Sequence, residues 1–134
     1  MSYLRADLPP ITLTTTDSAR LQRLVSAAES TFPRTADFLS REIERAEIVD
    51  SISLLPGVVV MGSEVEFRDE TTGQVRRVTL VYPNEADVAV GRISVLTPIG
   101  AALIGLSVSQ TMEWETPGGE RRSLTILSVS RTAD

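Results

Sequence analysis

Apolar side chains recur every three or four residues in two stretches near the N-terminus, a spacing that places them on one face of an α-helix. The apolar positions are Leu21, Leu24, Val25 and Ala28 in the first stretch and Ala36, Leu39, Ile43 and Ala46 in the second. The pattern predicts amphipathic helices over about 15–30 and 36–46, with a helix-capping side chain supplied by the cluster at 14–17. Residues 31–35 interrupt the pattern, and so short a connection favours an antiparallel helical hairpin.

Beyond residue 57 the apolar period changes to two, which is typical of β-strands. Residues 69–73 are predicted to form a hairpin turn before a return strand at 74–81. Further strands are expected at 93–96, 111–115 and 123–129. The fold class is therefore α+β, with a helical N-terminal segment over residues 1–53 and a small β-rich domain with one short helix over residues 54–134.

The segment 93–106 is apolar enough for a core, but proline and glycine interrupt it at defined points. Pro98 fits the first position of a helix, because its fixed φ suits that position and its missing N–H is not needed there. Thr97 would end the preceding strand and cap the helix, and Gly105 can stop the helix in the left-handed region. The segment holds no group capable of catalysis, and we interpret it as a shaped backbone corner.

Histidine, cysteine and lysine are missing from the chain. Without histidine and cysteine there is no Ser-His or Cys-His nucleophile, no thiolate metal site and no disulfide framework. Without lysine there is no Schiff-base chemistry. The net charge of −5 argues against a nucleic-acid partner, which would need a basic face. The remaining classes are a binding module and a carboxylate-dependent enzyme.

The sequence also bears on where the protein is found. No apolar run approaches the roughly 20 residues that cross a bilayer, and the N-terminal sequence shows no secretory signal. We therefore expect a cytoplasmic protein without membrane contact. The oligomeric state is left open.

Candidate chemical motifs are weak. Gly100 and Gly105 form a G-x-x-x-x-G string, but a phosphate-binding loop continues with Lys and Ser or Thr, and here Leu106 and Ser107 follow. The acidic residues closest to a metal or acid–base arrangement are Glu42, Glu44 and Glu47 on the second helix and Glu113 and Glu115 on one strand. We interpret both groups as solvated faces, so no catalytic residue, metal ion or cofactor is expected.

Two arginine pairs lie next to predicted turns. They are Arg76-Arg77 and Arg121-Arg122. We interpret them as ordinary surface charge, although they could contact an acidic partner. Trp114, the only tryptophan, is assigned to the core.

Several segments together resemble a known family. They are TLVYP (79–83), ISV (93–95), TPIGAALIG (97–105), WE (114–115) and PGG (117–119). In these segments the chain is similar to the C-terminal domain of the bacterial Gre-type transcript-cleavage factors, GreA and GreB. It resembles more closely still the short relatives called regulator of nucleoside diphosphate kinase (Rnk). The resemblance covers about residues 54–129 well and the hairpin less well.

The resemblance implies an FKBP-like C-terminal domain, a small antiparallel β-sheet with one short helix. It also implies a partner, because this domain in the family docks on RNA polymerase at the rim of the secondary channel, against a coiled coil of the largest subunit. By match to the family's docking corner, the partner-binding residues here would be Thr97, Pro98, Ile99 and Gly100.

The hairpin departs from the family pattern. A cleavage factor carries Asp-x-x-Glu at the tip of a long coiled coil, where the acidic pair completes a second Mg²⁺ site in the polymerase. Here Glu29 and Asp37 stand eight positions apart, and an arm of about 15 residues reaches only roughly 22 Å. We therefore expect a non-catalytic transcription regulator that competes with Gre-type factors.

Two other functions stay open at this stage. The first is a peptidyl-prolyl isomerase, suggested by the FKBP-like fold alone, although the C-terminal half offers only Phe67, Tyr82 and Trp114 to line a pocket. The second is a protein adaptor that regulates nucleotide metabolism indirectly.

Overall fold

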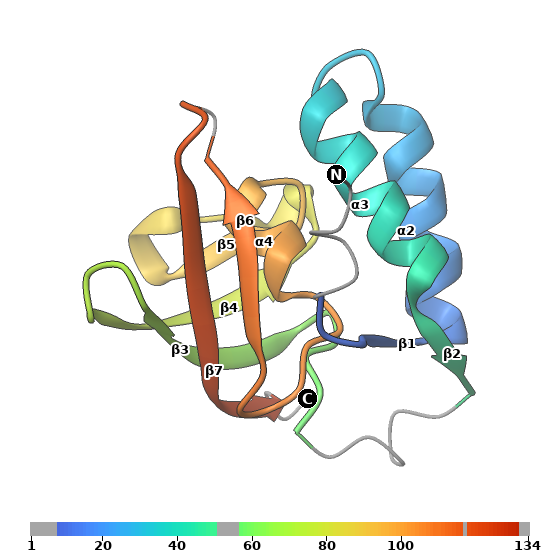
Figure 1. Ribbon diagram of the computed structural model, residues 1–134. Coiled ribbons are helices and arrows are strands. Elements are labelled where there is room, and N and C mark those ends of the chain that lie inside the picture. Colours follow the sequence, from blue (N-terminus) through green and yellow to red (C-terminus); the bar gives the residue numbers. More distant parts are fainter. Residues whose placement is uncertain (1–7, 51–56, 117, 132–134) are drawn as a thin grey trace.

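The computed structural model describes residues 8–50, 57–116 and 118–131, and it places a helical hairpin beside a twisted β-sheet (Figure 1). The hairpin consists of α2 (Thr15–Ala28) and α3 (Pro33–Arg45), as the apolar pattern predicts. Two short parallel strands, β1 (Thr12–Thr14) and β2 (Glu47–Val49), pair at its base. The expected boundary between residues 53 and 54 lies outside the described residues.

The helix ends follow from local chemistry. Thr14 caps α2, because its Oγ1 accepts a hydrogen bond from the backbone N–H of Asp17 at 3.0 Å. α3 begins at Pro33 rather than at Ala36, since proline suits the first helical position. Six of the eight predicted apolar positions are buried between the helices and the sheet, and the other two, Leu24 and Ala46, are partly buried.

The C-terminal part forms a five-stranded sheet in the order β5-β4-β3-β7-β6. The strands are β3 (Ser63–Asp69), β4 (Val75–Val81), β5 (Arg92–Ser94), β6 (Thr111–Glu115) and β7 (Arg121–Arg131). Neighbours are antiparallel except β4 and β5, so the sheet is mixed rather than wholly antiparallel as expected. The chain after β4 makes two 3-10 turns, η2 (Pro83–Glu85) and η3 (Val88–Val90), and crosses back before β5 begins.

One apolar core joins the hairpin to the sheet. Its buried members come from β1, both hairpin helices, α4 (Pro98–Leu103) and all five strands of the sheet. The N-terminal segment is tied in through Gly105, whose carbonyl oxygen accepts from the backbone N–H of Thr12 at 3.1 Å. Gly105 has a φ of +84°, and a Cβ there would lie 2.9 Å from the Cβ of Ile11. Glycine therefore both ends the short helix and admits the N-terminal segment.

Glu42 contradicts the interpretation of the acidic residues of α3 as a solvated face. Its side chain is 1% exposed, and Arg45 Nη2 and Nε donate to its two carboxylate oxygens at 2.7 and 2.9 Å. Arg45 Nη1 also donates to the carbonyl oxygen of Pro9. The interpretation is wrong for Glu42 because the chain that precedes β1 crosses this part of the helix and meets the ion pair there.

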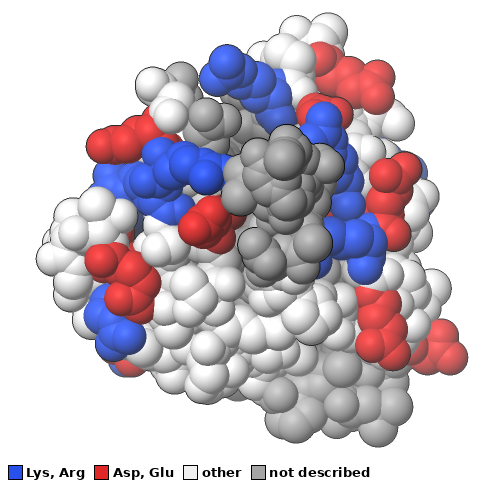
Figure 2. Space-filling view, in the orientation of Figure 1, with Lys and Arg blue, Asp and Glu red and all other residues white. Residues whose placement is uncertain are grey.

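Charged side chains of both signs are interspersed around the face shown in Figure 2, and its lower central area is largely uncharged. The acidic excess of the chain is therefore not gathered into one patch of this face. Within the described residues, no helix is long and apolar enough to cross a bilayer.

Candidate functional site

One hydroxyl group builds the corner before α4. Thr97 Oγ1 donates to the carbonyl oxygen of Ser94 at 2.7 Å and accepts from the backbone N–H of Gly100 at 3.1 Å. The first bond fixes the turn after β5, and the second caps the helix, so one side chain holds both sides of the corner. The predicted cap and the left-handed stop at Gly105 are confirmed, whereas β5 ends at Ser94, earlier than expected.

Gly100 is required by a close approach of the backbone. A Cβ at this position would lie 2.1 Å from the carbonyl oxygen of Ser94, far inside contact distance. Gly100 is buried, while Thr97, Pro98 and Ile99 are half-buried. Of the four predicted partner-binding residues, three therefore expose surface and the fourth sets the shape of the corner.

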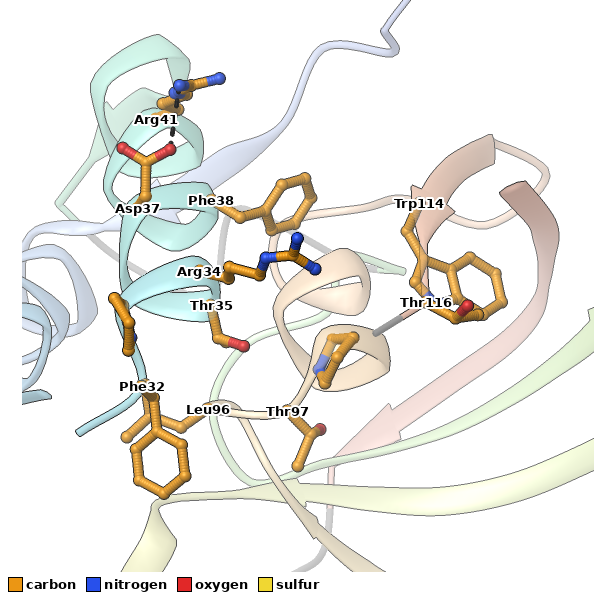
Figure 3. A pocket seen from close by; sticks show the side chains of 12 residues that line it. Phe32, Arg34, Thr35, Asp37, Phe38, Arg41, Leu96, Thr97, Trp114 and Thr116 are labelled. Carbon is orange, nitrogen blue, oxygen red and sulfur yellow. Dashed lines mark ion pairs between the residues drawn. The ribbon is translucent and has the colours of Figure 1, made fainter. Parts of the chain in front are cut away.

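A groove of about 670 Å³ lies between the corner and the hairpin (Figure 3). Its main walls are Phe32, Arg34 and Phe38 from the hairpin and Thr97, Pro98 and Trp114 from the β-rich part. The volume is within the range of about 300–1,000 Å³ that is usual for binding pockets. The corner is thus one wall of a concave, largely apolar surface.

The hairpin brings positive charge to this groove. Figure 3 shows the Arg34 side chain extending from α3 towards α4, whereas Asp37 and Arg41 are joined to each other elsewhere along the helix. Arg41 Nη2 lies 2.9 Å from Asp37 Oδ2. Arg34 is exposed, and no ion pair holds it within the described part of the chain. The guanidinium of Arg34, which has no ion-pair partner among the described residues, therefore stands next to the corner together with the aromatic side chains of the groove.

The pattern of residues in the sequence does not indicate the hairpin side of the groove, and it predicts Trp114 in the core. Trp114 is indeed 9% exposed, and it also lines the groove. Phe32 is 50% exposed although it is aromatic. The available signal is Phe32 itself, which stands at a helix–proline junction where polar residues are usual.

The arginine pairs singled out in the sequence interact within the molecule. Arg77 Nη2 lies 3.6 Å from Glu66 Oε2, and Arg122 Nη2 lies 2.7 Å from Asp69 Oδ2. These side chains are thus less available to a partner than Arg34. Among the residues that the structure describes, no group of three acidic side chains is placed to hold a metal ion.

A second contact joins α2 to the sheet through Tyr82. The guanidinium carbon of Arg20 lies 4.5 Å from the centre of the Tyr82 ring, a cation–π distance. Nearby, Asp17 Oδ2 accepts from the backbone N–H of Met61 at 3.1 Å. Burial raises the pKa of Asp17 above its usual value and raises the pKa of Tyr82 to about 12. Asp17 and Tyr82 are both partly buried where α2 packs against the end of β4.

The Tyr82 hydroxyl is buried without a hydrogen-bond partner among the described residues. Tyr82→Phe removes this polar group and keeps the ring beneath Arg20, so we expect the free energy of unfolding to rise by about 1 kcal/mol. Chemical denaturation measures the change. Tyr82→Ala is the control, because it also removes the ring and should lower the free energy of unfolding by about 3 kcal/mol. A Tyr82→Phe variant less stable than the parent would contradict the prediction.

The sequence matches two family models that divide the chain between them. Residues 55–131 match the model described as "Transcription elongation factor, GreA/GreB, C-term", and residues 9–49 match the model described as "Rnk N-terminus".

Individual proteins of both kinds are also similar to this chain. The regulator of nucleoside diphosphate kinase of Escherichia coli (strain K12) is 36% identical over 121 residues, which are 90% of this chain and 89% of that protein. Transcription elongation factor GreA of Methylobacterium nodulans is 40% identical over 88 residues, or 66% of this chain and 55% of that protein. A solved structure, the prokaryotic transcription elongation factor GreA/GreB from Nitrosomonas europaea, has a TM-score of 0.71 and 38% identity, covering 91% of this chain and 98% of that chain.

Proposed function

The chain belongs to the family that joins an Rnk N-terminal region to a GreA/GreB-type C-terminal domain, and from this membership we propose that it binds RNA polymerase and regulates transcription without cleaving transcripts. The proposed contact is the coiled coil of the largest subunit at the rim of the secondary channel, where the protein would compete with Gre-type factors. Such a partner would place the protein in the cytoplasm.

The observation that carries the proposal is the rigid corner at residues 97–100. The Thr97 hydroxyl donates one hydrogen bond and accepts another, and the two bonds fix the backbone of the corner before any partner arrives. Pro98 stands on the exposed side of the corner at the edge of the groove. A preformed surface loses little conformational entropy on binding. The corner is therefore suited to docking and carries no group for chemistry.

The hairpin supports a role without transcript cleavage. α2 and α3 contain 14 and 13 residues, so each arm is roughly 20 Å long at 1.5 Å per residue. At the tip, the carboxylate of Asp37 is paired with Arg41 at 2.9 Å, and Glu29 stands at the end of the other helix. The tip thus offers no adjacent pair of carboxylates to a metal ion in a partner's active centre.

An isomerase or an adaptor is less well supported. Phe67 is fully buried, Tyr82 packs against α2, and Trp114 lines the groove. These three aromatic side chains therefore do not line a common pocket for a prolyl peptide. No contact in the described residues favours the adaptor over polymerase binding.

A titration of core RNA polymerase tests the docking corner. Pro98→Asp places a charge on the exposed side of the corner, and we expect it to weaken binding at least about tenfold, which corresponds to about 1.4 kcal/mol. The variant should fold, because aspartate is favourable in the first turn of a helix. Binding is measured by fluorescence anisotropy of the labelled chain, with GreA as competitor.

The control is Val75→Asp, at an exposed position on β4 that is not among the groove residues. It should bind as the parent does. If the Pro98→Asp variant and the parent bind with equal affinity, the corner is not part of the contact with polymerase. A parent chain that binds no polymerase would overturn the proposed function.

A further inference from the structure

The groove beside the corner has walls from two separate parts of the chain. Phe32 and Phe38 come from the hairpin, and Pro98 and Trp114 come from the β-rich part. The match to the Rnk N-terminal model ends at residue 49 and the match to the GreA/GreB C-terminal model begins at residue 55, so neither part alone forms this surface. A segment held in the groove would touch both parts at once.

The charge of the groove is opposite to that of the chain. The whole chain has a net charge of −5, yet the groove is lined by Arg34 and Arg41 against the single carboxylate of Asp37. Asp37 is occupied by Arg41, which leaves Arg34 to face the groove. The backbone adds to this, because α3 begins beside Arg34 without a side-chain cap.

We propose that this groove holds a polymerase segment in which an apolar side chain lies beside a carboxylate, with Arg34 pairing with the carboxylate; this rests on the proposed function. The apolar side chain would enter between Phe38 and Trp114, with Phe32 at the other end of the same groove, because burial of aromatic surface contributes most to affinity. The hairpin tip then acts in partner recognition, a role that the docking corner alone does not supply.

Arginine suits this task for a physical reason. A guanidinium group can donate two parallel hydrogen bonds to one carboxylate, and a pair of this kind is stronger and more directional than a neutral hydrogen bond. The surrounding Phe32, Phe38 and Trp114 exclude water from it once the groove is filled. A segment with a lysine at the same place would leave two cations facing each other and would be rejected.

Photocrosslinking with the full chain and core RNA polymerase tests the inference. Benzoylphenylalanine replaces Phe32 in one variant and Val75 in a matched control, because the two side chains are 50% and 48% exposed. We expect position 32 to form an adduct with a polymerase segment that contains an acidic residue next to an apolar one. Position 75 should form at most about one tenth as much.

Charge variants complete the test. Arg34→Glu should weaken polymerase binding about tenfold or more and remove most of the adduct at position 32. It should fold, since Glu is favourable in the first turn of a helix. Arg23→Glu is the matched control, because it makes the same charge change at an exposed position of the other hairpin helix that is not among the groove residues, and it should change binding less than about twofold.

The outcomes separate the two proposals. If the parent binds and Pro98→Asp weakens it, but position 32 gives no adduct or Arg34→Glu binds normally, the groove inference is wrong and the docking function stands. An adduct with nucleic acid or with a second copy of the chain also overturns the inference. A parent chain that does not bind polymerase overturns both.

Discussion

Arg45→Ala is expected to lower the free energy of unfolding by about 3–5 kcal/mol, because it leaves the carboxylate of Glu42 buried and unpaired. Glu42 is 1% exposed, and both of its carboxylate oxygens accept from Arg45. The same guanidinium holds the carbonyl oxygen of Pro9, so the substitution also releases the chain that precedes β1. Urea or guanidinium denaturation followed by circular dichroism measures the loss.

Two controls show whether an isolated buried charge causes this loss. Arg41→Ala breaks the exposed pair with Asp37, whose side chain is 61% exposed, and should cost about 0.5 kcal/mol or less. The double variant Glu42→Met/Arg45→Met replaces both charges with apolar side chains and should recover most of the stability lost in Arg45→Ala. An Arg45→Ala variant as stable as the Arg41→Ala variant would contradict the prediction.

Gly100→Ala is expected to lower the free energy of unfolding by about 3 kcal/mol, although alanine is normally the better helix former. The new Cβ would lie 2.1 Å from the carbonyl oxygen of Ser94. That oxygen accepts the hydrogen bond from Thr97 Oγ1, so the backbone can relieve the overlap only by opening the corner. If the corner binds polymerase, affinity should fall together with stability.

Gly118→Ala is the matched control for this substitution. A Cβ at Gly118 would lie 3.9 Å from Thr116 Oγ1, an ordinary contact distance, so we expect a change of no more than about 0.5 kcal/mol. Thermal and denaturant unfolding of the two variants side by side give the comparison. If Gly100→Ala changed the free energy of unfolding no more than Gly118→Ala does, the corner would tolerate a side chain at position 100. The prediction from the close approach would then be wrong.

Local structure was predictable because its causes lie within a few residues. The start of α4 follows from the chemistry of Thr97 and Pro98, and its end follows from that of Gly105. The structure agrees with both predictions. The hairpin followed likewise from the spacing of apolar residues along each helix. In both cases the information needed is contained in one turn or one helix face.

Features that depend on distant segments were not predictable. Glu42 lies on the polar side of a helical wheel, but in the structure it is buried and paired with Arg45, which also donates to the carbonyl oxygen of the distant Pro9. β5 lies parallel to β4 because of the path taken by the loop between them, which the strand pattern does not encode. The groove needs Phe32 and Trp114 to line one surface from opposite sides, and that arrangement is fixed by how the hairpin packs on the sheet.

The length of the two hairpin helices sets how far the tip lies from the base. Phe32 and Arg34 reach the level of Pro98 and Trp114 only because α2 contains 14 residues and α3 contains 13. Seven additional residues in each arm would move the tip about 10 Å farther along the helix axis. The aromatic and cationic side chains would then pass beyond the corner and the groove would lose one wall. In this architecture, deep reach and a closed docking groove are alternatives, and the number of helical turns selects between them.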